Sequence, residues 1–425
     1  MAILLKNATY IDWENLRFSN PHIIVHQGID DKLEFVDAGK PIDESNFSKI
    51  IDCTGKLVTK SFVVGHHHVY SALAKGMPAP KKSPENFREI LQYVWWTLDK
   101  SLDKDTIEAS ALASAIACAK AGTTFVIDHH ASPNFIGGSL DIIAKAFDKV
   151  GVSHLLAYEI TDRDGMDKAQ AGLEESESYL SKNQGLVGMH ASFTVNDKTM
   201  KQAADLMQKL NSGFHIHVAE GIYDQTHCVE KYDKRVVERL ADYGVLNSSK
   251  TILVHGLHLD DRERELIKNS PVWVAQNNES NMNNAVGHFN GDGMGSNIMF
   301  GTDGMHSDML QSAKSAFFAG QGADTIDYPG VYDRFRKAHR YIESNDFKGD
   351  GKNNLVVLNY DGPTELTSEN FLGHFVFGIN SNHVEHVISD GRLIVENREI
   401  TTVNEEEVLR FTREQSLRLW KQMQK

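Results

Sequence analysis

The sequence predicts an α/β protein, a (β/α)8 TIM-like barrel with a small β-sandwich-like domain formed from both chain ends. Length is the first observation, because 425 residues exceed an ordinary domain of about 100–200 residues and suit a barrel of roughly 250 residues with an accessory unit. The second observation is that short β-branched runs alternate with longer helical segments through the middle of the chain. The third is that both ends carry short alternating strands separated by turns.

Eight strand-like runs succeed one another in the middle of the chain. They are apolar nearly throughout, as are strands buried on both faces of a parallel sheet, and they span residues 61–65, 123–128, 152–159, 186–190, 213–220, 251–255, 272–277 and 297–303. Between most of them lie amphipathic segments of helical length, such as 105–122, 139–151 and 196–213, which end in glycine as helices often do. The link at 278–293 is the exception and is expected to be a loop with at most a short helix. Eight such units favour a closed barrel over an open sheet.

The two chain ends differ from the middle. Short runs with strand alternation lie at 21–28, 32–39, 354–360 and 383–397. We therefore expect a composite small β domain from residues 1–58 plus 353–402, and a barrel from residues 59–352. The last segment, 403–425, has acidic residues early, Lys and Arg late, and apolar residues three to four positions apart. This pattern predicts a helix that packs on the barrel or on the small domain.

Composition narrows the classes of function. Lys and Arg number 44 against 58 Asp and Glu, a formal net charge of −14, which disfavours nucleic acids and anionic membranes as partners. No apolar run approaches the roughly 20 residues of a membrane span, and the first residues lack the pattern of a secretion signal, so a cytoplasmic location is expected. The three cysteines are widely spaced with no CxxC pair. A metal site would therefore have to use imidazole and carboxylate ligands.

Histidines cluster at the end of the first predicted strand, in Gly65-His66-His67-His68. Alternate side chains of a strand share a face, so His66 and His68 can both point into a barrel mouth while His67 points away. Two imidazoles at this spacing make half of a metal site. Taken alone, the pair is explained equally well by solvated histidines.

Other predicted strands end in residues of the same kind. The fifth strand carries His217 followed by Glu220, the sixth ends at His255, and the eighth ends at Asp303. Barrel enzymes keep their active sites at the face formed by the C-terminal ends of the strands, so these residues are expected to converge there. Three imidazoles and a carboxylate would hold Zn²⁺ or Fe²⁺ and leave a position for water, whose pKa such an ion lowers to about 7.

Three of these residues are candidates for catalytic roles. Asp303 can bind the metal and accept a proton from water. Glu220 can carry a proton to a leaving nitrogen. His255 can either polarise a substrate group or complete the ligand set.

Long stretches around these residues resemble the amidohydrolase superfamily, in the branch of cytosine, guanine and S-adenosylhomocysteine deaminases and triazine hydrolases, and within it the SsnA group of aminohydrolases. The similar stretches span nearly the whole chain and are GHHHVYSALAKGM, YVWWTLDKSLD, VIDHHASPNFIGGSLD, YEITDRDG, HIHVAEG, NESNMNNAVG and GTDGMHSDM. The resemblance implies that the metal ligands are His66, His68, His217 and Asp303. It also implies that Glu220 and His255 transfer protons and polarise the substrate, and that His190 contacts the substrate.

Two departures from the family pattern bear on the site. Binuclear members carry a carboxylated lysine at the end of the fourth strand, where this sequence has Met189-His190-Ala191. The resemblance therefore implies one divalent metal per chain, zinc by first choice and iron as the alternative. The usual His-Asn-Pro after the seventh strand is replaced by Gln276-Asn277-Asn278. The asparagine of the motif is retained as Asn277. The loss of its two neighbours is expected to change the conformation of the loop and therefore how the substrate fits.

Residues around the expected mouth are candidates for substrate binding. The set is His190, Tyr158, Glu159, Asn277 and His129, with Asp162 as a further specificity residue. Asp128 and His130 could line the pocket or form a hydrogen-bonded loop pair. Trp95 and Trp96 are expected to pack, and His288 and His306 are expected on active-site loops.

The expected function is hydrolysis of a C–N bond, most directly deamination of a purine-, pyrimidine- or triazine-like small molecule with release of ammonia. Two alternatives stay open at this point. One is an amidase or dipeptidase of the same superfamily, and the other is a metal-binding protein without turnover. The family analogy also implies a homodimer or a higher homo-oligomer.

Overall fold

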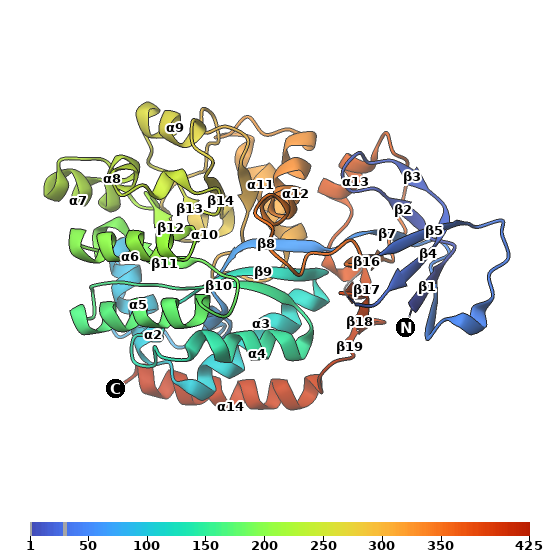
Figure 1. Ribbon diagram of the computed structural model, residues 1–425, viewed down its shortest axis with the longest axis horizontal. Helices are drawn as coiled ribbons and strands as arrows, with labels where there is room; N and C mark the ends of the chain where they lie inside the picture. Colours follow the sequence, from blue (N-terminus) through green and yellow to red (C-terminus); the bar gives the residue numbers. More distant parts are fainter. Residues whose placement is uncertain (1, 29–31) are drawn as a thin grey trace.

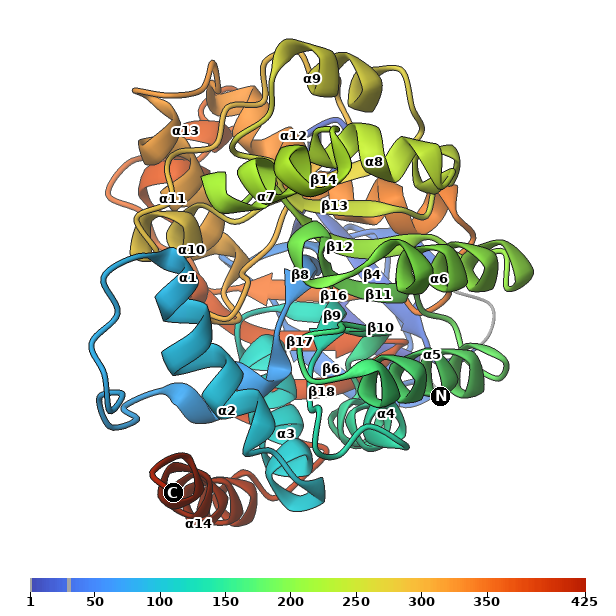
Figure 2. The same ribbon diagram turned by 90° about the vertical axis from the view of Figure 1, so that its left-hand side faces the viewer.

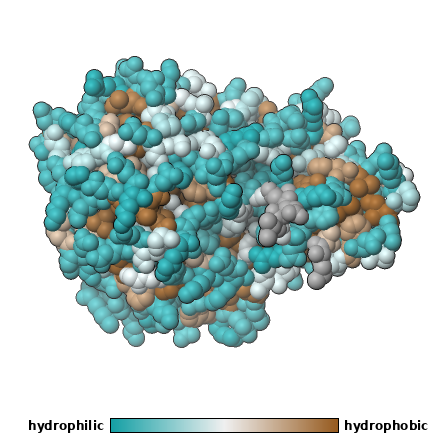
Figure 3. Space-filling model, viewed as in Figure 1, coloured by the Kyte–Doolittle hydropathy of each residue, from teal (hydrophilic) through white to brown (hydrophobic). Residues whose placement is uncertain are grey.

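The computed structural model describes residues 2–28 and 32–425 and shows a chain of mixed α/β structure in two parts (Figure 1). Helices surround a set of strands in the larger part, and a mainly β part that contains the N-terminus lies beside it. The face seen in Figure 1 is largely hydrophilic, with apolar side chains confined to smaller patches (Figure 3). None of the helices in the described ranges combines the length and the apolar composition that a membrane crossing requires.

Eight parallel strands follow the chain order in the larger part. Their bounds are β8 Phe62–His67, β9 Thr123–His130, β10 Ser153–Tyr158, β11 Val187–Ala191, β12 Phe214–Val218, β13 Ile252–His255, β14 Trp273–Gln276 and β15 Ile298–Phe300. They form a three-stranded sheet, β10-β9-β8, and a five-stranded sheet, β11-β12-β13-β14-β15. Isolated parallel bridges link the sheets at Ile160 and Met189 on one side and at His67 and Asp303 on the other. The eight strands predicted from the sequence are confirmed.

Helices lie around these strands (Figure 2). Their bounds are α1 Phe87–Ile90, α2 Trp96–Lys100, α3 Lys104–Lys120, α4 Ser139–Val150, α5 Met166–Leu180, α6 Asp197–Lys209, α7 Ile222–Tyr232, α8 Val236–Asp242, α9 Asp261–Lys268, α10 Asn278–Asn283, α11 Met309–Gly320, α12 Tyr328–Ser344, α13 Phe371–Phe377 and α14 Glu405–Met423. Asp103, Asn196 and Asp260 begin α3, α6 and α9 by accepting hydrogen bonds from N–H groups of the first turn. Helix α10 is the short helix expected within 278–293.

The core explains why the strand ends meet on one face. Every residue of β8, β9, β11 and β12 is buried. Because alternate side chains of a strand point to opposite faces, Val63 and Ile127 join one buried cluster with Val254, while Val64 and Val126 pack with helix residues in another. Packing on both faces keeps these parallel strands side by side, so their carboxyl ends lie on the same side of the larger part.

The mainly β part is assembled from both ends of the chain. Its strands are β1 Ala2–Lys6, β2 Thr9–Ile11, β3 Phe18–Ser19, β4 Pro21–His26, β5 Leu33–Asp37, β6 Lys49–Asp52, β7 Leu57–Lys60, β16 Leu355–Leu358, β17 Val384–Ser389, β18 Arg392–Glu396 and β19 Glu399–Ile400. They form two sheets, β5-β4-β1-β6 and β19-β18-β17-β16-β7-β2-β3. Leu5 and Val25 from the first sheet share a buried cluster with Val357 and Ile388 from the second. Residues 1 and 29–31 of the expected small domain lie outside the described part.

Helix α14 closes the chain against the larger part, beside α3 (Figures 1 and 2). Three glutamates occupy its first turn and Lys421 its last, which matches the helix dipole. Trp420 Nε1 donates to the carbonyl of Leu73 at 2.7 Å, and Lys120 Nζ donates to Glu405 Oε1 at 2.7 Å. The predicted C-terminal helix is therefore present and lies on the helices of the larger part.

Leu419 anchors this helix, and its truncation is expected to cost stability. The side chain is 1% exposed, whereas that of Leu417 on the same helix is 64% exposed. Leu419→Ala should lower the free energy of unfolding by about 2–5 kcal/mol, because it leaves a cavity in packed surroundings. Leu417→Ala is the matched control, with an expected change within about 0.5 kcal/mol. Urea unfolding of both variants measures this difference, and equal effects would contradict the docked position of α14.

Candidate active site

The carboxyl ends of β8, β9, β12 and β13 and the residues after β15 bring histidines and carboxylates together. His68 Nε2 lies 3.2 Å from His217 Nε2 and 3.3 Å from Asp303 Oδ1. His66 Nε2 lies 3.8 Å from the same oxygen. His67 points elsewhere and contacts Ser307 Oγ at 3.1 Å, as the alternation of the strand predicts. The structure therefore brings together the four residues expected as metal ligands.

Hydrogen bonds at the far side of two rings determine which nitrogens face the centre of this cluster. His68 Nδ1 donates to the carbonyl of His129 at 2.5 Å, and His217 Nδ1 donates to the carbonyl of His190 at 2.9 Å. Burial holds the pKa of His217 well below its usual value, which favours the neutral form of that ring. A neutral imidazole has one N–H and one lone pair, so when both rings are neutral each Nε2 presents a lone pair to the other across 3.2 Å.

Lone pairs that face each other repel unless a cation lies between them. His66 Nε2 is also buried without a hydrogen-bond partner, and burial lowers the pKa of His66 well below its usual value. Burial raises the pKa of Asp303, but the adjacent His68 and His255 imidazoles bring it below its usual value, so the carboxylate is the favoured form. Neutral imidazoles and an ionised carboxylate are the forms that bind metals. The donor set therefore fits a divalent cation.

A second group at the same centre joins Glu220, His255 and Asp303. His255 Nε2 lies 3.4 Å from Glu220 Oε2 and 3.7 Å from Asp303 Oδ2. The His255 ring is oriented by Asn281, whose Nδ2 lies 2.8 Å from His255 Nδ1, and Asn284 Nδ2 donates to Glu220 Oε1 at 3.3 Å. Burial, with Asp303 nearby, raises the pKa of Glu220 well above its usual value. Burial lowers the pKa of His255 to about 4.

Backbone strain accompanies these strand ends. His255 and Asp303 have φ values of 74° and 51°, in the left-handed region that side chains other than glycine seldom adopt. Gly301 allows the close approach of β15 to β8, because a Cβ at that position would lie 2.8 Å from His66 Cβ and 2.3 Å from Asn277 Oδ1. Strained residues of this kind persist where the surrounding packing holds them and are frequent at functional sites.

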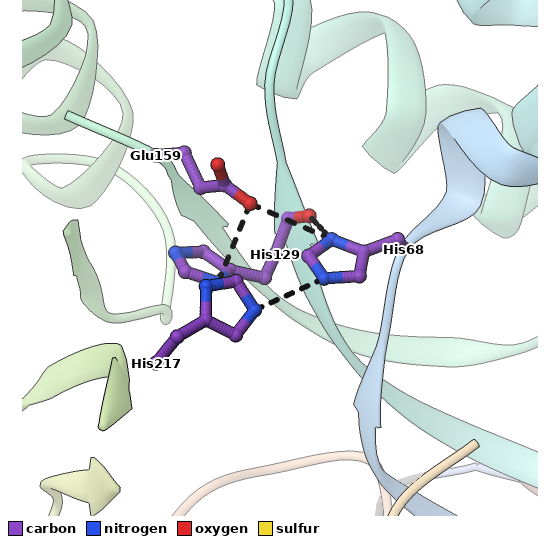
Figure 4. A group of neighbouring side chains, drawn as sticks. All are labelled: His68, His129, Glu159 and His217. Carbon is purple, nitrogen blue, oxygen red and sulfur yellow. Dashed lines mark hydrogen bonds and ion pairs between the residues drawn. The ribbon is translucent and has the colours of Figure 1, made fainter. Parts of the chain in front are cut away.

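His129 and Glu159 lie beside the metal-ligand cluster and point toward it (Figure 4). Glu159 Oε1 is 3.6 Å from His68 Nδ1 and 3.7 Å from His129 Nδ1. Burial raises the pKa of Glu159 to about 7 and lowers that of His129 well below its usual value. His68, His129, Glu159 and His217 form a further group that could hold a metal ion.

A cavity opens onto this cluster and contains several of the predicted residues. His68, Glu159, His190, His217, Glu220 and Asp303 line it. Its aromatic lining comes from Tyr70, Phe87, Trp95, Trp96, Phe193 and Tyr223. A cavity lined by aromatic side chains together with a few polar groups suits a small molecule.

Other sequence candidates lie away from the cavity lining. Tyr158 is buried against Gly172, and Asn277 Nδ2 donates to the carbonyl of Ala275 at 3.1 Å. Asp162 accepts hydrogen bonds from the Asn196 N–H and the Thr199 hydroxyl at the start of α6. Asp128 accepts from the Val69 N–H, His130 contacts the Ser132 hydroxyl, His288 is exposed, and His306 pairs with Glu279.

The cavity wall also carries a charged group that was not predicted from the sequence. Arg163 pairs with Asp99 and lies over the ring of Trp96, 4.9 Å from its centre. Asp99 Oδ1 and Trp96 Nε1 are buried without hydrogen-bond partners. Trp95 and Trp96, expected only to pack, both line the cavity. No spacing in the sequence indicates this group, because its members come from α2 and from the loop after β10.

Comparison with known proteins places these features in a family. Residues 58–328 match the amidohydrolase family. The chain belongs to the amidohydrolase family. Members of this family are metal-dependent hydrolases, so this amidohydrolase is an enzyme that hydrolyses C–N bonds. The resemblance stated from the sequence is confirmed.

Curated relatives of this amidohydrolase match it nearly end to end. It is 25% identical to a 5-methylthioadenosine/S-adenosylhomocysteine deaminase of Thermoanaerobacter pseudethanolicus, with 96% of this chain and 97% of the relative covered. It is 24% identical to a 5'-deoxyadenosine deaminase of Methanobrevibacter smithii, with 97% of each chain covered.

Solved structures share the fold. An adenosine deaminase from Xanthomonas campestris with bound zinc has a TM-score of 0.81 at 17% identity, with 98% of each chain covered. A zinc complex of the atrazine chlorohydrolase of Arthrobacter aurescens has a TM-score of 0.78 at 15% identity, with 97% of this chain and 100% of that chain covered. With the family match, these neighbours imply a TIM-barrel-like α/β fold.

Proposed function

We propose that this amidohydrolase deaminates an N-heterocyclic small molecule hydrolytically, releasing ammonia and leaving a carbonyl group on the ring. The observation that carries the proposal is the position of Glu220, a buried carboxyl group with a raised pKa beside His255 and Asp303 on the wall of an aromatic cavity. An amino group leaves a ring carbon only after it gains a proton, and a buried acid at this position can donate one. Relatives named as deaminases support the same reaction.

The proposed metal ligands are His66, His68, His217 and Asp303, with one divalent ion per chain and zinc ahead of iron. When bound, such an ion acts as a Lewis acid and makes water more acidic. The facing lone pairs of His68 and His217 and the unpartnered nitrogen of His66 support this ligand set. Zinc in two of the similar structures supports the choice of metal.

Two side chains of the protein then transfer protons, and a third stabilises charge. Asp303 accepts a proton from the attacking water, because its lowered pKa keeps it ionised. Glu220 holds a proton and delivers it to the departing nitrogen, and the proton that Asp303 took from the water restores Glu220. The second proton of the water moves to a ring nitrogen of the substrate as the carbonyl forms. His255, fixed by Asn281, stabilises charge that develops on the substrate next to Asp303.

Substrate binding is proposed for His190 and Glu159 at the cavity wall, with the aromatic lining stacked on the ring of the substrate. Tyr158, Asn277 and His129 stay predicted substrate-binding residues. Tyr158 and Asn277 are buried behind the wall, so any effect of theirs would come through the side chains that they support.

The finer description of the chain is also proposed. We propose that the strands β8–β15 close into a (β/α)8 barrel, which the bridges between the two sheets support. The proposed domains are 1–58 plus 353–402, 59–352, and the helix of 403–425. A cytoplasmic homodimer or higher homo-oligomer remains part of the proposal.

The test is an assay of products from the metal-loaded enzyme. A panel of purines, pyrimidines, pterins and triazines is incubated with the enzyme, ammonia is quantified, and the ring product is identified by mass spectrometry. We expect one ammonia per turnover and a carbonyl in place of the amine. Cleavage of N-acyl or dipeptide substrates without ammonia from the panel would favour the amidase alternative. Metal binding without turnover on either set would favour a metal-binding protein.

A further inference from the structure

His129 and Glu159 are buried polar groups beside the proposed metal ligands, and the proposed ligand set does not include them. Both ring nitrogens of His129 and the Oε1 atom of Glu159 are buried without hydrogen bonds. Leaving such atoms unsatisfied costs roughly 1–3 kcal/mol each. Both side chains point toward His68 and His217 (Figure 4), and one ligand atom from each of the four residues lies within 4.8 Å of the others.

The donors in this group are those of a zinc site. His68, His217 and His129 supply three imidazoles and Glu159 supplies a carboxylate, which matches the number and type of ligands in many zinc sites. The described part of the site also offers other groups: His66 and Asp303 lie with His68, and His66 and His255 lie with His217. His68 and His217 can thus bind an ion together with either of two pairs of residues, His129 with Glu159 or His66 with Asp303.

Sharing limits how many ions can be bound at once. His68 and His217 each use Nδ1 to donate to a carbonyl group, so each retains a single lone pair, at Nε2. A lone pair can serve one ion at a time. Two ions held through both rings are therefore excluded, and the two ligand sets are alternatives.

We propose that His129 and Glu159 form a second, alternative position for the divalent ion, exclusive with the position at His66 and Asp303. The inference rests on the proposed metal site, because both positions need His68 and His217. It predicts one ion per chain with two possible sets of ligands, and it assigns to Glu159 a ligand role in addition to its place on the cavity wall.

The test is a Co²⁺ titration of the metal-free protein in four forms: wild type, Glu159→Gln, Asp303→Asn and the double variant. Affinity and the visible absorption of bound Co²⁺ report the ligands directly, without an activity assay. We expect Glu159→Gln alone to change the affinity little, because the Asp303 position remains. Asp303→Asn should bind more weakly but retain one ion with an altered spectrum. Adding Glu159→Gln to Asp303→Asn should weaken Co²⁺ binding further by at least about 10-fold. Removal of a residue that only hydrogen-bonds to a metal ligand already costs that much affinity.

Two more variants in the Asp303→Asn background test whether the loss of Co²⁺ affinity comes from a missing ligand or from disturbed packing. His129→Asn should reproduce the effect of Glu159→Gln, because it removes the other ligand of the second position. His130→Asn is the matched control, since His130 is the next residue, equally buried, and contacts Ser132 instead of the cluster. Thermal melting of each metal-free variant verifies that it is folded. An equal loss of affinity in the His130 variant would overturn the proposal.

The remaining outcomes are also decisive. If Glu159→Gln weakens Co²⁺ binding equally in the wild type and in the Asp303→Asn variant, Glu159 acts together with Asp303. If it weakens binding in neither, Glu159 is not a ligand. An Asp303→Asn variant that binds no Co²⁺, or two ions per wild-type chain, would equally overturn the second position. If the wild type binds no ion, the proposed metal site itself fails. If it binds one ion and releases ammonia while Glu159→Gln is silent in the Asp303→Asn background, only this inference fails.

Discussion

Glu220→Gln should lower the turnover number by about 10²–10⁴-fold, the usual contribution of a general acid–base group, while the protein keeps its metal. Glutamine preserves the size of the side chain, and its Oε1 can still accept the hydrogen bond that Asn284 donates to Glu220. It cannot carry a proton, whereas burial and the nearby Asp303 raise the pKa of Glu220 and so favour its protonated form. The measurement is the turnover number with the substrate found in the ammonia screen, together with the metal content of the same preparation.

Asp303→Asn is the comparison that separates proton transfer from metal binding. An amide oxygen is a poorer ligand and a poor base, so this variant should lose affinity for the metal as well as activity. The two carboxyl groups belong to the same group of possible ligands, which makes the pair a stringent test. If Glu220→Gln loses as much metal as Asp303→Asn does, Glu220 is a ligand and the division of roles is wrong.

His217→Ala should purify with far less than one ion per chain and with almost no activity. His217 Nε2 faces His68 Nε2 at 3.2 Å, and its removal takes one imidazole from the cluster and leaves the remaining ligands too few. We expect the affinity to fall by more than the roughly 10–100-fold that follows loss of an outer partner. His66→Ala should act in the same way. Metal content is measured by elemental analysis after dialysis against a fixed free concentration of zinc.

His190→Asn is the matched control for this loss. His190 lies on the cavity wall, and its backbone carbonyl, which accepts from His217 Nδ1, survives the substitution. This variant should keep its metal and lose substrate affinity. Wild-type metal content in His217→Ala would contradict the ligand assignment.

Local pattern was sufficient to predict the eight strands and the meeting of histidines and Asp303 at their carboxyl ends. Strands buried on both faces are apolar along their whole length, so β8–β15 could be recognised one by one. The spacing of His66 and His68 places both rings on one face of β8, because strand side chains alternate. His217 and Asp303 could be added because strands of one parallel set end on the same side. Each of these inferences needs only the residues of a single element and the direction of its strand.

Contacts between distant elements could be assigned only from the tertiary structure. The pairing of Arg163 with Asp99 and the approach of Glu159 to His68 and His129 join residues of different elements whose side-chain directions no periodicity specifies. Asn277, expected at the mouth, instead lies against the position of Gly301. The physical reason is that rotamers and hydrogen-bond partners are chosen by packing across the whole site. A sequence pattern can assign a side chain to a face, but the neighbours on that face decide what it contacts.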